Sequence, residues 1–382
     1  MGSNPTPSAE GPEFGSRERN AQGFGAAGWS GCVRLNPVVK GADGGTAGGT
    51  EWRANPHPKP AYDRDRITEF ALPNGSEPVG INAAAAYENP PGWGRRVWFT
   101  ERGTGKVGAI SEAGILSEFA VPAGPGLEGM GTGPDGRYWF ATGPSHSLGA
   151  IEQSGSNALT EYPLPEGDVT DVSSFGSPGS AWYAESTGSI GTVTVAGSVK
   201  TVFSNPSVAP TNLSPMGGEK AMWYTNTACL VSANPCSIGF VKESGEGEQF
   251  LTGSGVPGGI AFWTGTPAEP YFTMSEGLNS WIMRCKGSWS GICKETIKYP
   301  LPLGSKPGAI VRVWAEGDRW TGKYAYWFTE EGTDRVGRLG PEGSITEFQL
   351  PLGSLPTDIG IDEEGNAWVT LRGTDRLAKI AL

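Results

Sequence analysis

Histidine and positive charge are scarce in this sequence of 382 residues. It has two histidines, 29 Lys and Arg against 40 Asp and Glu, and a formal net charge of −11. Proteins that bind nucleic acid without regard to sequence neutralise phosphates with clustered Lys and Arg, and acidic membrane surfaces attract the same clusters. We therefore expect the chain to bind neither nucleic acid nor an acidic membrane surface.

Long apolar runs are also missing from the sequence. No stretch approaches the roughly 20 apolar residues that span a bilayer, and the first residues lack the basic-then-apolar pattern of a signal peptide. We expect no membrane insertion, and we expect this chain to be a mature or tagged form of an exported protein.

Glycine, proline and tryptophan are abundant, with 60, 31 and 14 copies. This composition suits many short strands joined by tight turns and suits long helices poorly. The sequence therefore predicts an all-β fold.

The five cysteines bear on the compartment. Cys229 and Cys236 flank one short segment, Cys285 and Cys293 flank another, and Cys32 stands alone. In an extracellular or periplasmic protein this spacing predicts two local disulfides and leaves Cys32 for an intermolecular bond or a free thiol. A four-cysteine zinc site is the alternative, but the spacings exceed the two to four residues typical of such sites.

Residues 1–65 differ in texture from the rest, with few clustered apolar residues in MGSNPTPSAEGPEFGSRERN and GADGGTAGGT. We expect a tag plus a low-complexity extension, because this composition buries too little surface to offset chain entropy. The segment GFGAAGWSGCVRL around Cys32 is the exception, and it leaves an assembly role open.

From Arg66 onward, one unit recurs seven times. It opens with a segment such as ITEFALP at 67–73, followed by a Pro-x-Gly-Ile segment, a tryptophan segment such as WFTE at 98–101 and a glycine segment such as KVGAI at 106–110. The aromatic residue of the opening segment recurs at steps of 41 to 49 residues, at Phe70, Phe119, Tyr162, Phe203, Phe250, Tyr299 and Phe348. Four β-favouring segments per unit predict a seven-bladed β-propeller of four-stranded antiparallel blades over residues 66–382.

The order of segments predicts how the ring closes. We place Pro-x-Gly-Ile innermost, the tryptophan segment second, the glycine segment third and the ITEF segment outermost. The outermost segment at Ile67 to Leu72 precedes any innermost one, whereas the last unit ends after its third segment. We therefore expect Ile67 to Leu72 to pair with the blade made by residues 354–382. The repeated Trp and Phe or Tyr residues are expected to pack between blades.

The ITEF(x)LP, WFTE and (K/R)VGRL repeats over roughly residues 66–382 resemble those of the streptogramin B lyases, also called virginiamycin B lyases. The resemblance implies an enzyme that opens a cyclic depsipeptide by elimination at the ester. It also implies a magnesium ion near the channel mouth and a histidine as general base. In that family these residues stand where an innermost strand begins, in a pattern such as EPHGI, and where a second strand ends, in a pattern such as WFAME.

This chain departs from the family pattern at those positions. The innermost segments begin without histidine, with Glu-Pro-Val-Gly at 77–80, Val-Pro-Gly-Gly at 256–259, Lys-Pro-Gly-Ala at 306–309 and Leu-Pro-Thr-Asp at 355–358. Leu371 stands where the family places a carboxylate. His57 falls in the N-terminal extension and His146 in a loop. We expect His146 to be solvated, with a general-base role as the alternative.

Oxygen-bearing side chains nevertheless fall at one mouth of the predicted channel. Residues at the ends of second strands are predicted to meet residues at the starts of innermost strands; the two sets are Glu101, Glu185, Asn226 and Glu330, and Glu128, Asp171, Asn212 and Asp358. Such a ring would suit Ca²⁺, Mg²⁺ or a polar ligand. The alternative, which we favour, is local pairing as solvated charges, Glu101 with Arg102 or Lys106 and Glu330 with Arg335 or Arg338.

Three functions follow from these patterns. The favoured one is a non-catalytic extracytoplasmic propeller that binds a protein, glycan or small polar ligand at the channel mouth, with self-assembly through the extension around Cys32. The second is a streptogramin B lyase-like enzyme with a site rebuilt from carboxylates. The third is another metal-dependent propeller enzyme, such as a lactonase-like hydrolase.

Overall fold

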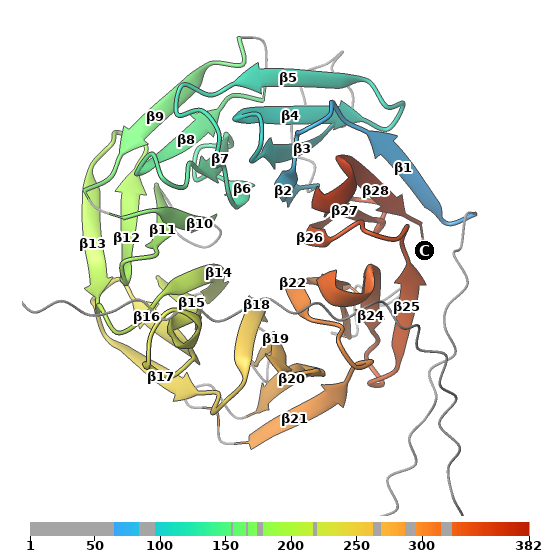
Figure 1. Ribbon diagram of the computed structural model, residues 1–382. Helices are drawn as coiled ribbons and strands as arrows, with labels where there is room; N and C mark the ends of the chain where they lie inside the picture. The colour runs from blue at the N-terminus through green and yellow to red at the C-terminus, as the bar shows by residue number, and fades with distance from the viewer. Residues whose placement is uncertain are drawn as a thin grey trace, which may run out of the picture. The chain divides into compact units, whose positions relative to one another are not determined.

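The computed structural model describes residues 65–83, 96–153, 156–165, 167–173, 179–216, 220–262, 269–286, 293, 295–314 and 323–381. Cys32 and His57 lie outside the described residues. The described chain forms seven four-stranded antiparallel sheets arranged as a ring (Figure 1). The predicted seven-bladed β-propeller is therefore confirmed.

Each blade contributes one strand to each of four positions, counted outward from the channel. The innermost strands are β2 (Pro78–Asn82), β6 (Met130–Thr132), β10 (Val169–Ser173), β14 (Pro210–Met216), β18 (Val256–Phe262), β22 (Pro307–Trp314) and β26 (Pro356–Ile361). The second strands are β3 (Arg96–Glu101), β7 (Tyr138–Ala141), β11 (Ser180–Glu185), β15 (Ala221–Asn226), β19 (Pro270–Glu276), β23 (Tyr324–Glu330) and β27 (Ala367–Leu371). The third strands are β4 (Lys106–Ser111), β8 (Ser147–Ile151), β12 (Ser189–Thr194), β16 (Ser237–Lys242), β20 (Asn279–Lys286), β24 (Arg335–Leu339) and β28 (Arg376–Ile380). The outermost strands are β5 (Leu116–Ala120), β9 (Leu159–Pro163), β13 (Val199–Ser204), β17 (Gly247–Leu251), β21 (Glu295–Pro300), β25 (Ile345–Gln349) and β1 (Ile67–Ala71).

The ring closes as the sequence predicts. Strand β1 pairs antiparallel with β28, from Ile67 opposite Ile380 to Ala71 opposite Arg376. The first and last strands of the described chain thus lie side by side, blue against red in Figure 1. We number the blades 1 to 7 from the one that begins with β2, so blade 7 is the closing blade, made of β26, β27, β28 and β1.

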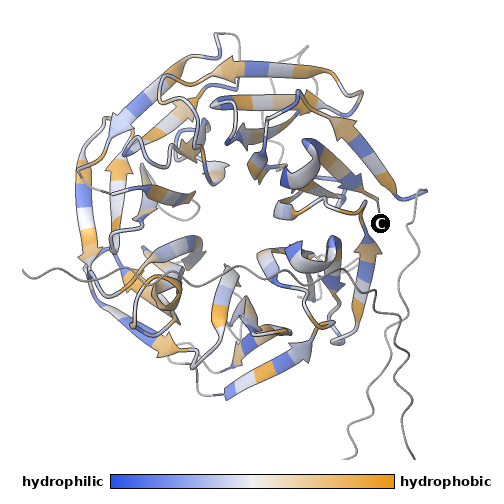
Figure 2. Ribbon diagram, viewed as in Figure 1, coloured by the Kyte–Doolittle hydropathy of each residue, from blue (hydrophilic) through white to orange (hydrophobic). Residues whose placement is uncertain are grey.

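Aromatic side chains fill the joints between blades. The tryptophans of six second strands are at most 1% exposed, namely Trp98, Trp139, Trp182, Trp223, Trp327 and Trp368. Trp98 stacks on Phe119 of its own blade and contacts Tyr138 of the next, with ring centroids 5.7 and 5.2 Å apart. The outer strands mix apolar and polar residues along their length (Figure 2), because one face packs on a neighbour while the other meets solvent. The inter-blade role predicted for these aromatics is confirmed.

The glycine of the third strand makes room for a second-strand ring. A Cβ added to Gly108 would lie 2.2 Å from the ring of Phe99, far inside van der Waals contact. The glycine in KVGAI and its relatives therefore serves blade packing.

An aspartate in the last blade fastens the ring-closing joint a second time. Asp375 accepts the backbone N–H of Gly75 and of Glu77, each at 2.8 Å, and so holds the turn that leads into β2. Asp334 fastens the corresponding turn before β26 in the same way. The repeated GTDR and PxGSxP motifs are the sequence signals of this clamp.

Two disulfides form between the cysteine pairs that the spacing predicts. Cys229–Cys236 closes a loop after β15, at the end of the ring where innermost strands begin. Cys285–Cys293 joins the end of β20 to the segment before β21, at the other end. The helical segments of the described chain are three-residue turns, η1 (Ala228–Leu230), η3 (Glu331–Thr333) and η4 (Arg372–Thr374), and none is long and apolar enough to cross a membrane.

Candidate functional site

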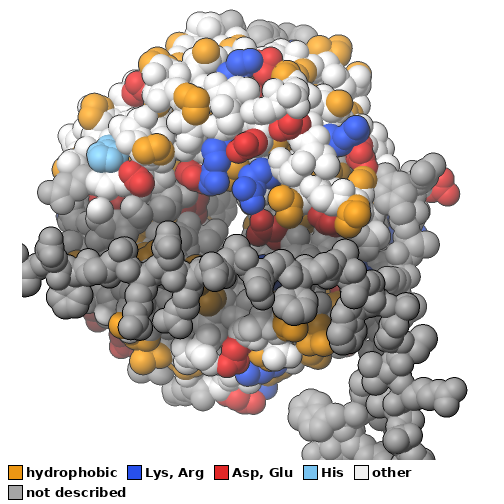
Figure 3. Space-filling view, in the orientation of Figure 1, with side chains coloured by type: hydrophobic (Ala, Val, Ile, Leu, Met, Phe, Trp, Pro, Cys, Tyr) orange, Lys and Arg blue, Asp and Glu red, His pale blue; other side chains and the backbone are white. Residues whose placement is uncertain are grey.

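A cavity of about 730 Å³ occupies the channel at the end where innermost strands begin. We call this end the channel mouth. Its wall comes from the innermost strands and from the loops that follow second strands. Basic and acidic side chains gather around the central hollow in Figure 3. The cavity thus has a wall of mixed polar and apolar residues, with charged side chains such as Arg102, Glu128 and Arg372 among them.

One equivalent position near the start of each innermost strand lines the cavity, two residues after a proline or the residue that takes its place; in blade 2 this position, Gly129, directly precedes β6. Going round the ring, these residues are Gly80, Gly129, Asp171, Asn212, Gly259, Ala309 and Asp358. We call them the wall ring. Four of the seven are glycine or alanine; a Cβ added at Gly80 would lie 2.7 Å from the carbonyl oxygen of Glu128, and one at Gly259 2.8 Å from that of Gly308, so these glycines let neighbouring blades approach closely.

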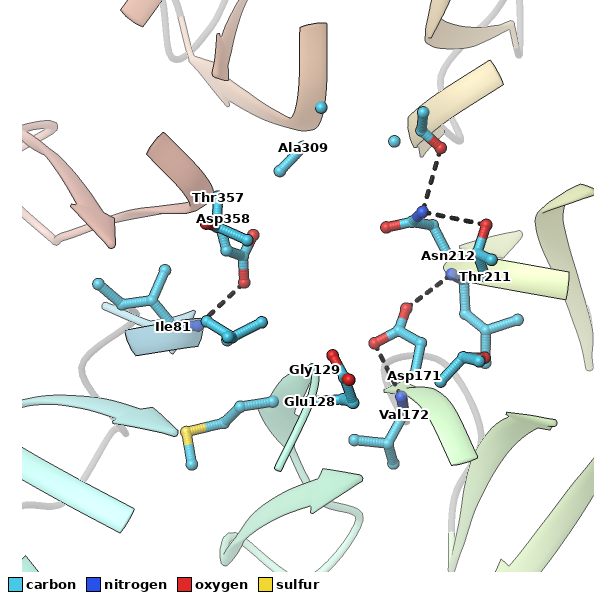
Figure 4. Close-up of a pocket in the computed structure, with 18 of the residues that line it drawn as sticks. Ile81, Glu128, Gly129, Asp171, Val172, Thr211, Asn212, Ala309, Thr357 and Asp358 are labelled. Carbon is cyan, nitrogen blue, oxygen red and sulfur yellow. Dashed lines mark hydrogen bonds between the residues drawn. The ribbon is translucent and has the colours of Figure 1, made fainter. Parts of the chain in front are cut away.

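The two aspartates of the wall ring are fixed by backbone N–H groups (Figure 4). The Asp171 carboxylate accepts the N–H of Val172 and of Leu213, each at 2.8 Å. The Asp358 carboxylate accepts the N–H of Ile359 at 2.8 Å and of Ile81 at 2.9 Å. Each aspartate therefore links its own blade to the next one and holds its carboxylate in one orientation.

Burial raises the pKa of both aspartates. The pKa of Asp171 rises to about 7, and that of Asp358 to about 6, because desolvation disfavours the charged carboxylate more than the backbone hydrogen bonds favour it. The charges of Asp358 and Glu128 push the pKa of Asp171 further up.

Gly129 shows how closely the wall is built around Asp171. A Cβ added at this position would lie 2.2 Å from Oδ1 of Asp171. Any side chain at residue 129 would displace the carboxylate, so glycine is required for the observed arrangement.

Asn212 supplies a neutral oxygen to the same ring. Its Nδ2 donates to the carbonyl oxygen of Gly258 at 3.1 Å, with longer contacts to the hydroxyls of Thr211 and Thr225. The amide oxygen is left on the channel side (Figure 4).

Two ion pairs lie nearer the opening. Arg102 donates to Glu128, and Arg372 donates to Glu331 at 2.9 Å. Burial raises the pKa of Glu128, while the hydrogen bond and charge of Arg102 and the charge of Arg372 act against that rise. Arg102 entered the sequence interpretation only as a partner of Glu101, and Arg372 and Glu331 did not enter it. The repeated ERGT, EEGT and LRGT motifs that follow second strands are the signal for all three.

His146 lies beside the mouth and does not line the cavity. Its Nε2 is 3.3 Å from Oδ1 of Asp168, and both side chains are about half exposed. Asp168 itself contributes to the cavity wall. The imidazole is therefore half exposed to solvent, with one carboxylate partner.

The second-strand residues do not reach the channel. Glu101 and Glu330 are 0% exposed inside blades 1 and 6, and burial raises the pKa of each to about 7. Glu101 accepts a hydrogen bond from Thr104, and Glu330 lies opposite Arg335 in the β23–β24 ladder. Their partners are local, but the expectation of solvated surface charges is wrong.

Asn226 and Glu185 are likewise buried in their blades, at 1% and 2% exposure. Asn226 accepts the N–H of Ala209 and of Ala228 and donates to Ser237, so it organises the loop closed by Cys229–Cys236. The eight predicted oxygen residues therefore separate into a channel set, Glu128, Asp171, Asn212 and Asp358, and a blade-internal set, Glu101, Glu185, Asn226 and Glu330.

The residues at the channel mouth do not fit a directly coordinated metal ion. Within the described ranges, one trio of acidic ligand atoms lies within 4.8 Å of one another, and it is Glu112, Asp362 and Glu364 at the other end of the ring. There Lys379 already lies 2.7 Å from Glu112 and 3.5 Å from Asp362 and compensates the charge. At the mouth, Asp171 and Asp358 stand on opposite walls (Figure 4). We derive no metal-assisted step from this site.

Comparison with known proteins assigns the fold to a family. The model of the virginiamycin B lyase family matches residues 62–265, more than half of the chain. The chain belongs to the virginiamycin B lyase family. A comparison with proteins of curated function gives no match.

Solved structures of this family share the whole propeller. A streptogramin B lyase structure is 25% identical with a TM-score of 0.66, covering 83% of this chain and 97% of that one. A catalytically inactive histidine-to-alanine variant of virginiamycin B lyase from Staphylococcus aureus, determined with quinupristin, is 24% identical with a TM-score of 0.65, covering 83% and 99%. Hydrazine synthase from Kuenenia stuttgartiensis, at 12% identity and a TM-score of 0.65 over 81% and 96%, shares the fold alone.

Proposed function

We propose that this virginiamycin B lyase family member is a non-catalytic binding propeller that takes a small polar ligand into the cavity at the channel mouth. The observation that carries the proposal is the composition of the cavity wall. Its described residues provide fixed carboxylates, an amide and two ion-paired arginines, but no histidine. A cavity of about 730 Å³ whose wall carries a few oriented polar groups has the size and character of a small-molecule site.

The family comparison supports the same conclusion. Replacement of one histidine leaves the Staphylococcus aureus relative catalytically inactive. In this chain the residues at the starts of the innermost strands are Val79, Thr357 and their equivalents, which lack an imidazole. An elimination needs a base within hydrogen-bond reach of the proton it removes, and no imidazole lines the described wall to supply one.

The proposal includes a location for the protein, outside the cytoplasm. Two disulfides are consistent with an oxidising, extracellular or periplasmic setting. We therefore place ligand binding outside the cytoplasm, where a protein or glycan that carries the ligand group could also dock at the mouth.

A binding screen tests the proposal directly. The full-length protein is screened by thermal shift against a library of small polar metabolites, and each compound that raises Tm is recovered and analysed. We expect compounds to be recovered unchanged. We also expect Ala309→Trp, which fills the wall ring, to abolish the shift while the variant itself melts cooperatively. Binding that survives Ala309→Trp, or conversion of the bound compound, would contradict the proposal.

The pair of His146 and Asp168 beside the mouth favours a second candidate, a lyase-like enzyme with a displaced base. Quinupristin is incubated with the protein and Mg²⁺, and the products are separated by chromatography and weighed by mass spectrometry. Elimination gives a linear product of unchanged mass, whereas hydrolysis adds one water, so the two enzymatic alternatives are distinguished. We expect intact quinupristin; ring opening that disappears in His146→Ala would establish the enzyme instead.

A further inference from the structure

The charges of the cavity wall are unevenly compensated. The carboxylates nearer the opening have cationic partners, Arg102 for Glu128 and Arg372 for Glu331. Deeper in the channel, Asp171 and Asp358 accept backbone N–H groups, and neither forms an ion pair among the described residues. Above the raised pKa values of the two aspartates, the deep part of the cavity therefore holds negative charge that no cationic side chain of the described residues offsets.

The deep wall also offers oxygen acceptors, and the hydroxyls of Thr170 and Thr357, which line it too, already donate to the backbone carbonyl oxygens of Pro210 and Leu355. The carboxylates of Asp171 and Asp358 and the amide oxygen of Asn212 all face the channel (Figure 4). The Asn212 amide nitrogen is committed to Gly258 and two threonines. A ligand at this level meets oxygens and must bring its own donors.

Space and orientation are already provided for such a ligand. The remaining wall-ring positions carry no side chain beyond a methyl group, at Gly80, Gly129, Gly259 and Ala309. The carboxylates need no reorganisation on binding because backbone N–H groups already hold them, which reduces the ordering cost. A single metal ion is too compact to engage acceptors on opposite walls, whereas an organic molecule has the length to do so.

We infer that the ligand of this cavity is a small organic cation that carries an ammonium, amidinium or guanidinium group. This inference rests on the proposed function, because it names the chemical class of the bound molecule. The cationic group donates to the carboxylate of Asp171 and to the amide oxygen of Asn212 on the neighbouring strand, and the organic frame extends toward Asp358 on the opposite wall. Burial raises the pKa of both aspartates, as expected for carboxylates that lack a counter-charge.

A series of probes of one shape and different charge tests the inference. Benzamidinium, benzamide and benzoate carry charges of +1, 0 and −1 on similar frames, and butane-1,4-diammonium serves as a second cation. Their affinities for the full-length protein are measured by isothermal titration calorimetry at pH 8. We expect benzamidinium to bind at least about tenfold more tightly than benzamide, with no measurable binding of benzoate. The comparison needs no variant, so it does not depend on a substituted protein folding.

Variants then locate the cation. Asp171→Asn with Asp358→Asn should weaken benzamidinium binding by about tenfold or more and leave benzamide unchanged. Glu112→Gln removes one negative charge at the other end of the ring and should change neither affinity. Benzamide binding as tightly as benzamidinium, no binding of either cation, or cation binding that is insensitive to the double variant would each overturn the inference.

The outcomes separate this inference from the proposed function. If neutral and cationic probes bind equally and Ala309→Trp abolishes both, the cavity binds ligands without charge selection and only the inference falls. If Ala309→Trp leaves the binding of every probe unchanged, the cavity is not the binding site and the proposed function falls with it.

Discussion

Buried carboxyl groups occur in two regions near the channel mouth, and they differ in what holds them. Glu101 and Glu330, at the ends of second strands, lie inside their blades beside charged residues of the third and outermost strands. Asp171 and Asp358, in innermost strands, are held by backbone N–H groups and face the channel. Burial raises the pKa in both regions, to between about 6 and about 7.

This difference shows that a residue at the mouth end of a strand does not reach the channel for that reason alone; it also matters whether the strand is innermost or second. Side chains of a propeller strand point alternately toward the two neighbouring blades, so the end of a second strand meets protein on both sides. The innermost strand has a free edge toward the axis. A register shift between Pro356 and Ile359 leaves Thr357 and Asp358 outside the ladder, and another between Val169 and Asp171 leaves Thr170 outside it, so the start of each of these innermost strands departs from regular pairing.

The largest loss of stability is expected from removing the cation that lies beside the buried glutamates inside blade 6. Arg335 donates to Glu347 at 3.3 Å, is 11% exposed and lies opposite Glu330. Arg335→Met leaves two buried glutamates without their cation, and we expect it to lower the free energy of unfolding at pH 8 by about 3–5 kcal/mol. Guanidinium chloride titrations measure the loss, which should shrink at pH 5 because protonation removes the uncompensated charge.

The closing blade provides the matched control for this change. Arg376 is the equivalent residue there, but Leu371 replaces the buried glutamate and Arg376 is 43% exposed. Arg376→Met should therefore cost no more than about 1 kcal/mol. Equal losses in the two variants would mean that the second-strand glutamate does not set the cost.

A smaller effect is expected from the channel-facing region. Asp358→Ala leaves the N–H of Ile81 and of Ile359 without their acceptor at the joint of blades 7 and 1. Unmade hydrogen bonds of buried groups cost about 1–3 kcal/mol each, so we expect a loss of about 2–4 kcal/mol after partial hydration from the channel. Hydrogen exchange of the Ile81 amide should speed up locally. A variant as stable as the parent would show that the carboxylate serves the ligand alone.

The smallest expected change is a gain in the free energy of unfolding, where the preceding variants lose stability. The pKa of Glu101 and of Glu330 is raised to about 7 from the ordinary 4.5, so the folded protein binds more protons than the unfolded chain between these values, and stability falls as pH rises through them. Glu101→Gln with Glu330→Gln keeps the neutral shape. We expect the double variant to be about 1–3 kcal/mol more stable than the parent at pH 8 and to show a flatter profile from pH 5 to 8. Asp171→Asn should not stabilise, because an amide accepts only one of the two N–H groups. A parent whose stability rises over that pH range would contradict the assignment.

The architecture could be predicted from the sequence because the same four-segment pattern recurs seven times. The spacing of Phe70, Phe119 and their relatives predicted the number of blades, and the early position of Ile67 to Leu72 predicted the strand that closes the ring. The site was less accessible. Asp171, Asn212 and Asp358 were expected at the mouth because they stand at the starts of innermost strands, whereas Glu101 fails to reach it because a second strand has neighbours on both faces. Arg102 and Arg372 were readable in principle from the repeated RGT motif, but their partners belong to other blades.

The pairing of β1 with β28 has a consequence for biosynthesis. A ribosome releases residues 67–71 long before residues 376–380 exist, so the earliest strand waits for the latest one while six blades assemble between them. Joining ends so far apart carries a large entropy cost and is slow. We expect this union to be the final event in maturation, and the nascent protein to need protection of its lone starting strand until translation is complete.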